Sequence, residues 1–316
     1  MSQNAKPKAS RQAFGEALAE LGGKHLDVVV LDADLAKSTK SELFAKKYPE
    51  RFFEMGIAEQ NMIGVAAGLG LAGKNAFCCS FACFVAGRFE TIKISVAYSG
   101  GNVKIVGTHA GVGIGPDGYS QMGLEDLALM RTLPGVEVFQ PADEIETQQM
   151  MAYLCASRGA AYLRLTRQEL TPVHGPDYRF VPGKIDVLAE GKDVAILATG
   201  GPTMHAVAAR AKLAESGIDA AVINVPSIKP MDREGIAKWA TRVPLFVTVE
   251  DHNVLGGMGG AVAEVLAEQP ARTARLHRHG IPDVFGESGE PDDLYRKFRL
   301  DADGITAVVR EALGRG

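Results

Sequence analysis

The sequence predicts an α/β protein with two domains. The first contains a mostly parallel sheet with helices on both faces, and the second is a smaller α/β domain. Short apolar and β-branched runs alternate with helix-length segments along the chain, as is typical of parallel sheets with crossover helices. Residues 171–192 interrupt this alternation with prolines and glycines and show no helical period. The length of 316 residues is sufficient for two domains.

The first domain is expected to span residues 1–175. A helix over residues 10–22 places apolar residues on one face, with Ser10 as its N-cap. A continuous apolar run over residues 27–31 predicts a strand buried on both faces, and a helix rich in glycine and alanine is expected over residues 59–72. Further strands are expected over residues 103–106, 136–139 and 161–165, and further helices over residues 124–133 and 143–157.

The alternation of strands and helices resumes after a linker, which we place at residues 176–192. The second domain is expected to span residues 193–316, and Asp232 is a suitable N-cap for one of its helices. Its strands are expected over residues 193–198, 218–224, 244–249 and 273–279, and its helices over residues 203–216, 232–240 and 257–268.

The composition excludes several classes of protein. A formal net charge of −4 disfavours nucleic-acid binding. The longest apolar stretch, residues 76–87, is too short to cross a bilayer, and the first residues lack the apolar segment of a secretory signal. The cysteines form no CxxC pair, so we expect free, buried thiols in a reducing cytoplasm. Cys78, Cys79 and Cys83 lie in an apolar run that we expect to be a strand, and Cys155 is the fourth cysteine.

A glycine-rich loop follows the strand expected over residues 103–106. Residues 113–118 match the GxGxxG spacing of dinucleotide-binding loops. However, His109 lies in a stretch that separates them from the strand, and Pro116 removes a backbone N–H donor. We therefore favour an active-site loop over nicotinamide or flavin binding.

Polar side chains in this region form the first candidate site. His109 lies just past the carboxyl end of a strand, where α/β sheets bind ligands, and Asp117 and Gln121 follow it. These side chains suit the hydroxyl and carbonyl groups of a polyol. Such residues also satisfy backbone groups within loops, so the residues alone leave both interpretations open.

A carboxyl group and two aromatic residues form a second candidate. Glu59 begins a helix, where the helix dipole favours a carboxylate, but apolar residues surround it in sequence. A buried carboxyl group can share a proton with a ligand nitrogen. Phe81 and Phe84 share a face only if their segment is helical, and they either fill a core or flank a flat heterocycle.

Scattered hydroxyl and basic residues are the weakest candidates. Arg11, Ser38 and Arg167 suit phosphate binding, because a guanidinium group can bind phosphate through two hydrogen bonds. Scattered arginines are more often part of the solvated surface.

The chain contains several long motifs, which are EMGIAEQNMIGVAAGLGLAG, SFACFVAGRFETIK, GTHAGVGIGPDGYSQMGLEDLALMR, QPADEIET, LRLTRQEL, VTVEDHNVLGGMGGAVAEVL and HGIPDVFGESGEPDDLY. Together these motifs resemble the transketolase family, in particular the C-terminal half that forms the B subunit of a split transketolase. The resemblance extends from residue 10 to about residue 301. It implies a thiamine-diphosphate-binding pyrimidine domain followed by a transketolase C-terminal domain.

The resemblance implies roles for the residues that could contact the cofactor. Glu59 matches the glutamate that holds the aminopyrimidine ring of thiamine diphosphate and shares a proton with its ring nitrogen. Phe81 and Phe84 match the aromatic residues that pack on this ring. Asp34 matches an acidic residue near the cofactor at the subunit boundary.

The resemblance also implies roles in substrate binding. His109 matches the histidine that touches the C1 hydroxyl of the ketose donor, and Asp117 matches the aspartate that binds a donor hydroxyl. Arg11, Ser38 and Arg167 match the residues that bind the sugar phosphate.

Two departures concern the choice of substrate. Gly87 stands where larger members often have a tyrosine, and Gln121 stands where many have a histidine. A third departure is that the chain has no Gly-Asp-Gly motif followed by asparagine, which holds the diphosphate and Mg²⁺ in the family. We therefore expect an A-type partner subunit, an A2B2 heterotetramer and no activity of this chain alone.

The expected reaction is the transfer of a two-carbon glycolaldehyde unit from a ketose to an aldose. We expect the ketose to be phosphorylated. Alternatives within the cofactor class are the beta subunit of a 2-oxo acid dehydrogenase and a deoxyxylulose-phosphate-synthase-like enzyme. A non-catalytic regulatory relative and a nicotinamide-dependent dehydrogenase are alternatives outside it.

Overall fold

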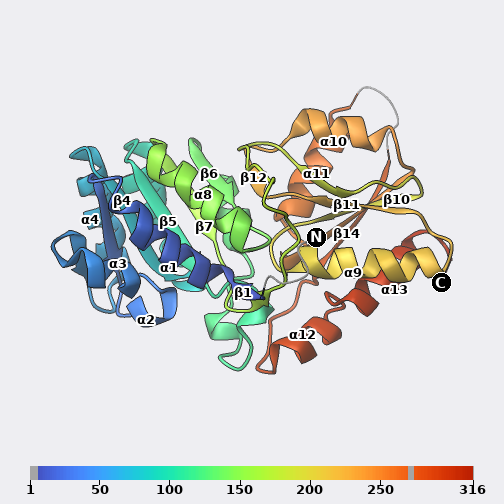
Figure 1. The fold of residues 1–316 in the computed structure, drawn as a ribbon, viewed down its shortest axis with the longest axis horizontal. Coiled ribbons are helices and arrows are strands. Elements are labelled where there is room, and N and C mark those ends of the chain that lie inside the picture. Colours follow the sequence, from blue (N-terminus) through green and yellow to red (C-terminus); the bar gives the residue numbers. More distant parts are fainter. Residues whose placement is uncertain (1–5, 270–273, 316) are drawn as a thin grey trace.

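The computed structural model describes residues 6–269 and 274–315. Its two large sheets lie side by side along the long axis (Figure 1). The larger sheet is formed mainly by the first half of the chain and the smaller sheet by the second half. The ends of the two expected domains, residues 1–5 and 316, lie outside the described residues, as does residue 273, the expected start of the last strand.

The larger sheet has seven strands in the order β12-β6-β7-β5-β4-β2-β3. Its strands are parallel except for β12, which pairs antiparallel with β6. The carboxyl ends of β7, β5, β4 and β2 therefore lie next to one another at one edge. The strands are β2 (Val28–Asp32), β3 (Phe52–Glu54), β4 (Asn75–Phe81), β5 (Val103–Thr108), β6 (Val136–Phe139), β7 (Ala160–Arg164) and β12 (Ser227–Lys229).

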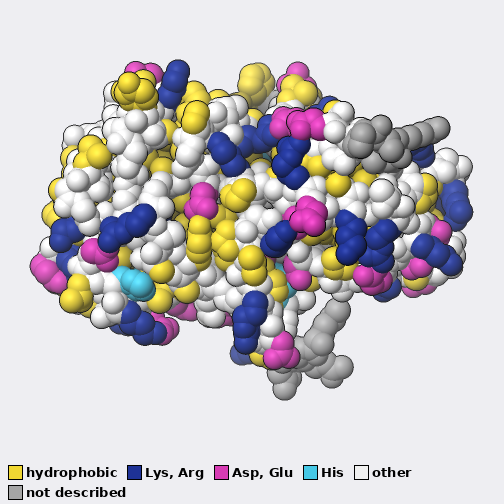
Figure 2. All heavy atoms as spheres, turned by 90° about the horizontal axis from the view of Figure 1, so that it is seen from above, with side chains coloured by type: hydrophobic (Ala, Val, Ile, Leu, Met, Phe, Trp, Pro, Cys, Tyr) yellow, Lys and Arg dark blue, Asp and Glu magenta, His cyan; other side chains and the backbone are white. Residues whose placement is uncertain are grey.

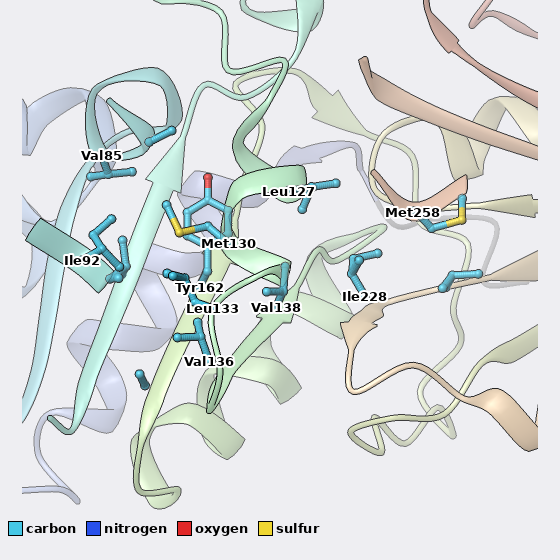
Figure 3. Packing of buried hydrophobic residues seen from close by; sticks show 14 of the residues in the cluster. Val85, Ile92, Leu127, Met130, Leu133, Val136, Val138, Tyr162, Ile228 and Met258 are labelled. Atoms are coloured by element: carbon cyan, nitrogen blue, oxygen red, sulfur yellow. The ribbon is translucent and has the colours of Figure 1, made fainter. Parts of the chain in front are cut away.

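Helices cover both faces of this sheet. One face packs against α1 (Ser10–Leu21), α3 (Glu42–Lys47) and α8 (Glu144–Ala156). The other packs against α4 (Glu59–Leu71), the π-helical segment Ile92–Tyr98 and α7 (Asp126–Arg131). Apolar residues of this second face continue without interruption into the second half of the chain, where Ile228 and Met258 extend the cluster (Figure 3).

The smaller sheet has five strands in the order β14-β13-β10-β11-β9, of which only β9 is antiparallel to its neighbour. Helices α9 and α13 pack on one face, and α10 and α11 pack on the other. The elements are β9 (Asp186–Ala189), β10 (Val194–Ala198), α9 (Pro202–Glu215), β11 (Ala220–Asn224), α10 (Arg233–Ala240), β13 (Leu245–Asn253), α11 (Met258–Ala267), β14 (Arg275–Ile281) and α13 (Ala302–Ala312).

Short elements complete the fold. Strand β1 (Lys8–Ala9) pairs antiparallel with β8 (Glu169–Leu170) beside the larger sheet. Single-turn and other short helices occur in the loops. They are α2 (Ala36–Thr39), α5 (Ala82–Ala86), α6 (Phe89–Thr91), α12 (Pro291–Lys297) and the 3-10 helices Pro49–Arg51, Val112–Ile114 and Tyr119–Gln121.

The surface agrees with the small net charge, because acidic and basic side chains are interspersed over the face shown in Figure 2. Within residues 6–269 and 274–315, no helix is both long and apolar enough to cross a membrane.

The structure corrects the expected start of the first helix. Ser10 is not the N-cap of α1; Ala9 occupies that position and makes no side-chain cap. Because β1 delivers the chain directly into α1, Ser10 is the first helical residue. Its Oγ accepts a hydrogen bond from the N–H of Thr166, at 2.8 Å, in the segment after β7. The N-cap role expected for Asp232 is confirmed, since its carboxylate accepts from the N–H of Gly235 at 3.0 Å.

The short strands β1, β3, β8, β9 and β12 were not expected, and the last two concern the expected domain organisation. Strand β9 lies inside residues 176–192, which we expected to be a linker, and it forms the partly exposed edge of the smaller sheet. Strand β12 comes from the second half of the chain but pairs with β6 of the larger sheet. Only three or four residues long, β9 and β12 have too few apolar positions for a detectable period. Cys83, expected on a strand, lies in α5, and all four cysteines are free.

A buried network of charged side chains around His174 connects the segment after β8 with the start of helix α8. His174 Nδ1 lies 2.9 Å from Asp143 Oδ2, and His174 Nε2 lies 3.4 Å from Asp186 Oδ2. Burial opposes the imidazolium charge, but the hydrogen bond to Asp143 and the nearby carboxylates of Asp186 and Glu146 raise the pKa of His174 to about 10. The imidazolium form is therefore the stable form in the folded chain at neutral pH.

Replacing His174 with Gln should lower stability in a pH-dependent way. Because the pKa of His174 is raised above 6.5, its charge stabilises the fold fully below about pH 6.5, and this contribution is lost as the pH rises toward 10. We expect the variant to lose roughly 3–5 kcal/mol at pH 6, the usual cost of breaking a buried ion pair, and clearly less near pH 10. Urea unfolding of both proteins across this range measures the difference, and an equal loss at both ends would contradict the assignment.

Candidate active site

Residues from neighbouring strands meet at the carboxyl edge of the larger sheet. Arg167 follows β7, His109 follows β5, Phe81 ends β4 and Asp34 follows β2. Arg11, in the first turn of α1, joins them through its contacts with Ser38, in the short helix α2 after β2, and with His109. Parallel sheets bind ligands at this edge, so the topology brings together candidates that are far apart in sequence.

A directed series of hydrogen bonds orients His109. The guanidinium of Arg11 donates to the carbonyl of Ser38 at 2.7 Å and contacts His109 Nε2 at 3.0 Å. Because a guanidinium only donates, Nε2 is the acceptor, and Nδ1 carries the proton that is donated to Thr108 Oγ1 at 2.8 Å. The Thr108 hydroxyl in turn donates to the carbonyl of Ser80 at 3.3 Å. The network therefore selects one neutral tautomer of His109.

The surroundings of His109 also keep its imidazole uncharged. Burial, together with the positive charges of Arg11, Arg167 and Lys40, lowers the pKa of His109 to about 3. The backbone of His109 adopts a φ of 57°, in the left-handed region that non-glycine residues seldom occupy. Packing and hydrogen bonds hold this conformation, as is common at functional sites.

The aromatic rings of Phe81 and Phe84 form a stack with the imidazole ring of His109. The ring centroids of His109 and Phe81 are 3.8 Å apart, and those of Phe81 and Phe84 are 5.5 Å apart with an interplanar angle of 5°. The two phenylalanines share a face because β4 ends at Phe81 and helix α5 begins at the next residue. The three rings form a continuous stack beside the sheet edge.

Glu59 is the first residue of α4 and is only 6% exposed. Its carboxylate accepts a hydrogen bond from the Ser80 hydroxyl at 3.1 Å. Of its apolar neighbours in sequence, Met62 and Ile63 are fully buried beside it in α4, whereas Ile57 is 84% exposed. Because Ser80 contacts Glu59 through its hydroxyl and Thr108 through its carbonyl, it links the carboxylate to the residues that orient His109.

Asp117 and Arg167 contact each other. Arg167 Nη1 lies 3.4 Å from Asp117 Oδ1 and donates to the carbonyl of Ile114 at 3.2 Å. Both side chains are partly exposed, so the ion pair contributes little to stability. Gln121 is half-buried in the 3-10 helix Tyr119–Gln121 and is not hydrogen-bonded to the other candidates within the part of the chain that the structure describes.

Asp34 lines a separate surface hollow of about 470 Å³ together with Ser38 and Glu54. Its φ of 63° is also left-handed, and its N–H donates to Glu54 Oε1 at 2.8 Å. The carbonyl of Ser38 is bound by Arg11, so this hollow adjoins the residues around His109.

The glycine-rich loop does not have the geometry of a dinucleotide-binding loop. It forms the three-residue 3-10 helix Val112–Ile114 instead of opening an α-helix. The N–H groups of Val112 and Gly113, which such a loop would offer to a diphosphate, are bound by the carboxylate of Asp251. This geometry disfavours dinucleotide binding at the loop.

Sequence reasoning missed the residues that support the site. Thr108 and Ser80 are short polar residues in buried strands, and their proximity to His109 and Phe81 in sequence was an available signal. Asp251 had no such signal, because it lies in another sheet, more than a hundred positions from the loop that it contacts.

Two family models match the chain. The model described as "Transketolase, pyrimidine binding domain" covers residues 6–172, and the model described as "Transketolase, C-terminal domain" covers residues 183–305. The chain belongs to the transketolase family. The larger sheet, apart from β12, is therefore its pyrimidine-binding domain, and the smaller sheet is its C-terminal domain.

The relatives and the solved structure most similar to this chain carry transketolase names. A chain of Methanocaldococcus jannaschii named as a transketolase C-terminal section is 44% identical over 309 residues, which is 97% of this chain and 96% of that one. A solved structure described as "Split gene transketolase, inactive beta4 tetramer" is 48% identical, with a TM-score of 0.89 over 97% of this chain and 98% of that one. The transketolase of Homo sapiens is 37% identical over 96% of this chain but only 48% of its own length.

Replacing Arg11 with Met should change the protonation chemistry of His109. The variant loses the donor to Nε2 and one positive charge, so we expect the pKa of His109 to rise from about 3 but to stay below 6.5, because burial remains. We also expect the other neutral tautomer to appear. Nitrogen-15 NMR of histidine-labelled protein, assigned with a His109→Gln variant, measures both.

Arg310→Met in α13 is a matched control, because Arg310 is exposed and remote from the site. It should leave the His109 signals unchanged. An imidazolium form of His109 in the unsubstituted protein at pH 6 would contradict the assignment.

Proposed function

We propose that this chain is the B subunit of a two-subunit, thiamine-diphosphate-dependent transketolase of the cytoplasm. The assembled enzyme would transfer a glycolaldehyde unit from a phosphorylated ketose to an aldose. The observation that carries the proposal is the convergence of Glu59, the ring stack of Phe81 and Phe84 and a neutral His109 at one sheet edge. The near-complete match to split transketolase chains supports it.

The residues near Glu59 fit the aminopyrimidine end of the cofactor. Within the described residues, the buried carboxylate of Glu59 has one side-chain donor, Ser80, which leaves an oxygen for a ring nitrogen. The flat faces of Phe81 and Phe84 suit packing against the ring. Thiamine diphosphate supplies the carbanion chemistry needed to break a bond next to a carbonyl group. Glu59 would hold the ring nitrogen and share its proton, and the aromatic pair would orient the ring.

The charges around His109 fit a sugar phosphate. Arg11, Arg167 and Lys40 all lie close enough to lower the pKa of His109, so their combined field favours an anion. Arg11 and Arg167 would bind the phosphate with Ser38. The uncharged His109 would exchange hydrogen bonds with the donor hydroxyls, and Asp117 would accept a hydrogen bond from one of them.

A partner subunit would complete the site. It would hold the diphosphate and Mg²⁺, for which the described residues contain no cluster of three or more potential ligands. Large apolar side chains stand exposed on and near the helix that begins at Glu59, among them Ile57, Val65 and Leu71. Exposed apolar residues of this kind mark protein interfaces. The solved beta4 tetramer that is similar to this chain is described as inactive, in line with an A2B2 assembly as the active form.

Glu59→Gln should abolish most of the transfer activity of the assembled enzyme. Glutamine keeps the size of the side chain but cannot exchange a proton, so we expect the turnover number to fall roughly 10²- to 10⁴-fold. Formation of the complex should be unchanged in gel filtration. Glu16→Gln is a matched control, because Glu16 lies exposed on α1 and pairs only with surface groups. Full activity of Glu59→Gln in the complex would favour a non-catalytic, regulatory role.

The dependence on a partner has its own test. The tagged chain would be isolated from native lysate, and proteins that co-purify in near-equal amount would be identified by mass spectrometry. We expect a chain with a Gly-Asp-Gly motif followed by asparagine, and ketose-to-aldose transfer only when both chains are present. Oxidation of pyruvate, or its condensation with a triose phosphate, would instead indicate one of the alternative thiamine-dependent reactions.

A further inference from the structure

A side chain of the C-terminal domain forms hydrogen bonds with the glycine-rich loop that carries Asp117. From this contact we propose that Asp251 and Tyr295 are positioning residues that set the place of Asp117 and thereby the affinity for the ketose donor. The inference rests on the proposed function for its substrate. Its structural part, that the C-terminal domain holds the loop, stands on contacts alone.

The carboxylate of Asp251 binds the loop directly. It lies at the carboxyl end of β13 and accepts hydrogen bonds from the N–H groups of Val112, at 2.8 Å, and Gly113, at 3.2 Å. The hydroxyl of Tyr295, in α12, donates to the same carboxylate at 3.0 Å. Asp251 is 3% exposed and Tyr295 is 2% exposed, so these hydrogen bonds form away from water. A buried carboxylate is tolerated only when it is hydrogen-bonded, and here the loop supplies two of its three donors.

The backbone of the loop lies against the C-terminal domain along its length. Gly111 has a φ of 81°, and a Cβ atom there would come within 2.1 Å of the Asp251 carboxylate. A Cβ atom at Gly115 would be 3.0 Å from the ring of Pro291, and one at Gly118 would be 2.5 Å from Ser288 Oγ. The glycines therefore allow a close approach that begins six residues before Asp117 and ends one residue after it.

Contacts with the pyrimidine domain hold Asp117 less firmly. The ion pair with Arg167 spans 3.4 Å between partly exposed side chains. Arg167 is also one of the groups proposed to bind the substrate phosphate, so this contact would change when substrate binds. The contacts with Asp251, Ser288 and Pro291 involve no proposed ligand group, and they would persist through a catalytic cycle.

Consequently, the C-terminal domain would affect donor recognition without touching the donor. Tyr295 would restrain Asp251, Asp251 would restrain the N–H groups of Val112 and Gly113, and the loop would carry Asp117. Loss of the Tyr295 hydroxyl would leave the other site residues in place but increase the mobility of the glycine-rich loop that carries Asp117.

The test is Tyr295→Phe in the complex of this chain with its partner. We expect the KM for the ketose donor to rise about three- to tenfold, the factor that corresponds to one lost hydrogen bond. We expect the turnover number at saturating donor and the Kd for thiamine diphosphate to change less than twofold. In an Asp117→Ala background, the same substitution should have no further effect on KM.

Tyr178→Phe is the matched control, because Tyr178 donates a comparable hydrogen bond to the buried Glu146 far from the loop in sequence. It should leave the KM for the donor unchanged. A merely structural role of Tyr295 would instead lower the turnover number or cofactor affinity, or would act equally in the Asp117→Ala background, and either result would overturn the proposal.

Hydrogen exchange separates this inference from the proposed function. Peptides that cover residues 109–121 should exchange faster in Tyr295→Phe than in the unsubstituted chain, and not faster in Tyr178→Phe. If the unsubstituted complex transfers no glycolaldehyde, the proposed function is wrong, while the exchange data still decide whether Asp251 and Tyr295 hold the loop. Unchanged exchange in Tyr295→Phe would refute that role directly.

Discussion

The buried guanidinium of Arg164 joins the parts of the molecule that surround the site. Its Nε and Nη2 donate to the carboxylate of Asp126 at 2.7 and 3.1 Å, and Nη2 also reaches the carbonyls of Gly123, at 2.8 Å, and Asp251, at 3.0 Å. A buried cation is stable only when its donors are paired, and removal of a partner leaves an uncompensated charge. Because β7, α7, the segment just before α7 and β13 meet at this one group, their relative positions are closely constrained.

The arginines near the site differ in how their charge is balanced. Asp126 neutralises Arg164 in the interior, whereas Arg11 and Arg167 lie at the sheet edge and have no comparable buried carboxylate among the described residues. Burial, together with the charges of Arg11 and Arg167, keeps His109 neutral, and the same charges favour an anionic ligand. The left-handed conformations of His109 and Asp34 occur at the same edge, which indicates that the surrounding packing maintains local strain where ligands would bind.

The two domains share more than a linker. Strand β12 of the second half completes the larger sheet, and the apolar cluster around Met130 and Val138 continues to Ile228 and Met258 across the boundary (Figure 3). The pyrimidine domain would therefore lose an edge strand and part of its core without the C-terminal domain. This shared packing is the structural basis on which Asp251 can contact the glycine-rich loop.

The sequence alone determined the α/β class, most helices and long strands, and the family. Buried strands and amphipathic helices have periods that are local properties of the chain, and motifs such as EMGIAEQNMIG can be compared directly. The sequence also indicated Glu59, Phe81, Phe84, Arg11 and His109 as candidate site residues. Their expected roles came from the resemblance to the transketolase family and not from the spacing of the residues. Only the tertiary structure decided the tautomer of His109, the pairing of Asp117 with Arg167, the short strands β9 and β12, and the contact from Asp251 to the loop. These features depend on hydrogen bonds and burial between segments distant in sequence, which no local pattern encodes.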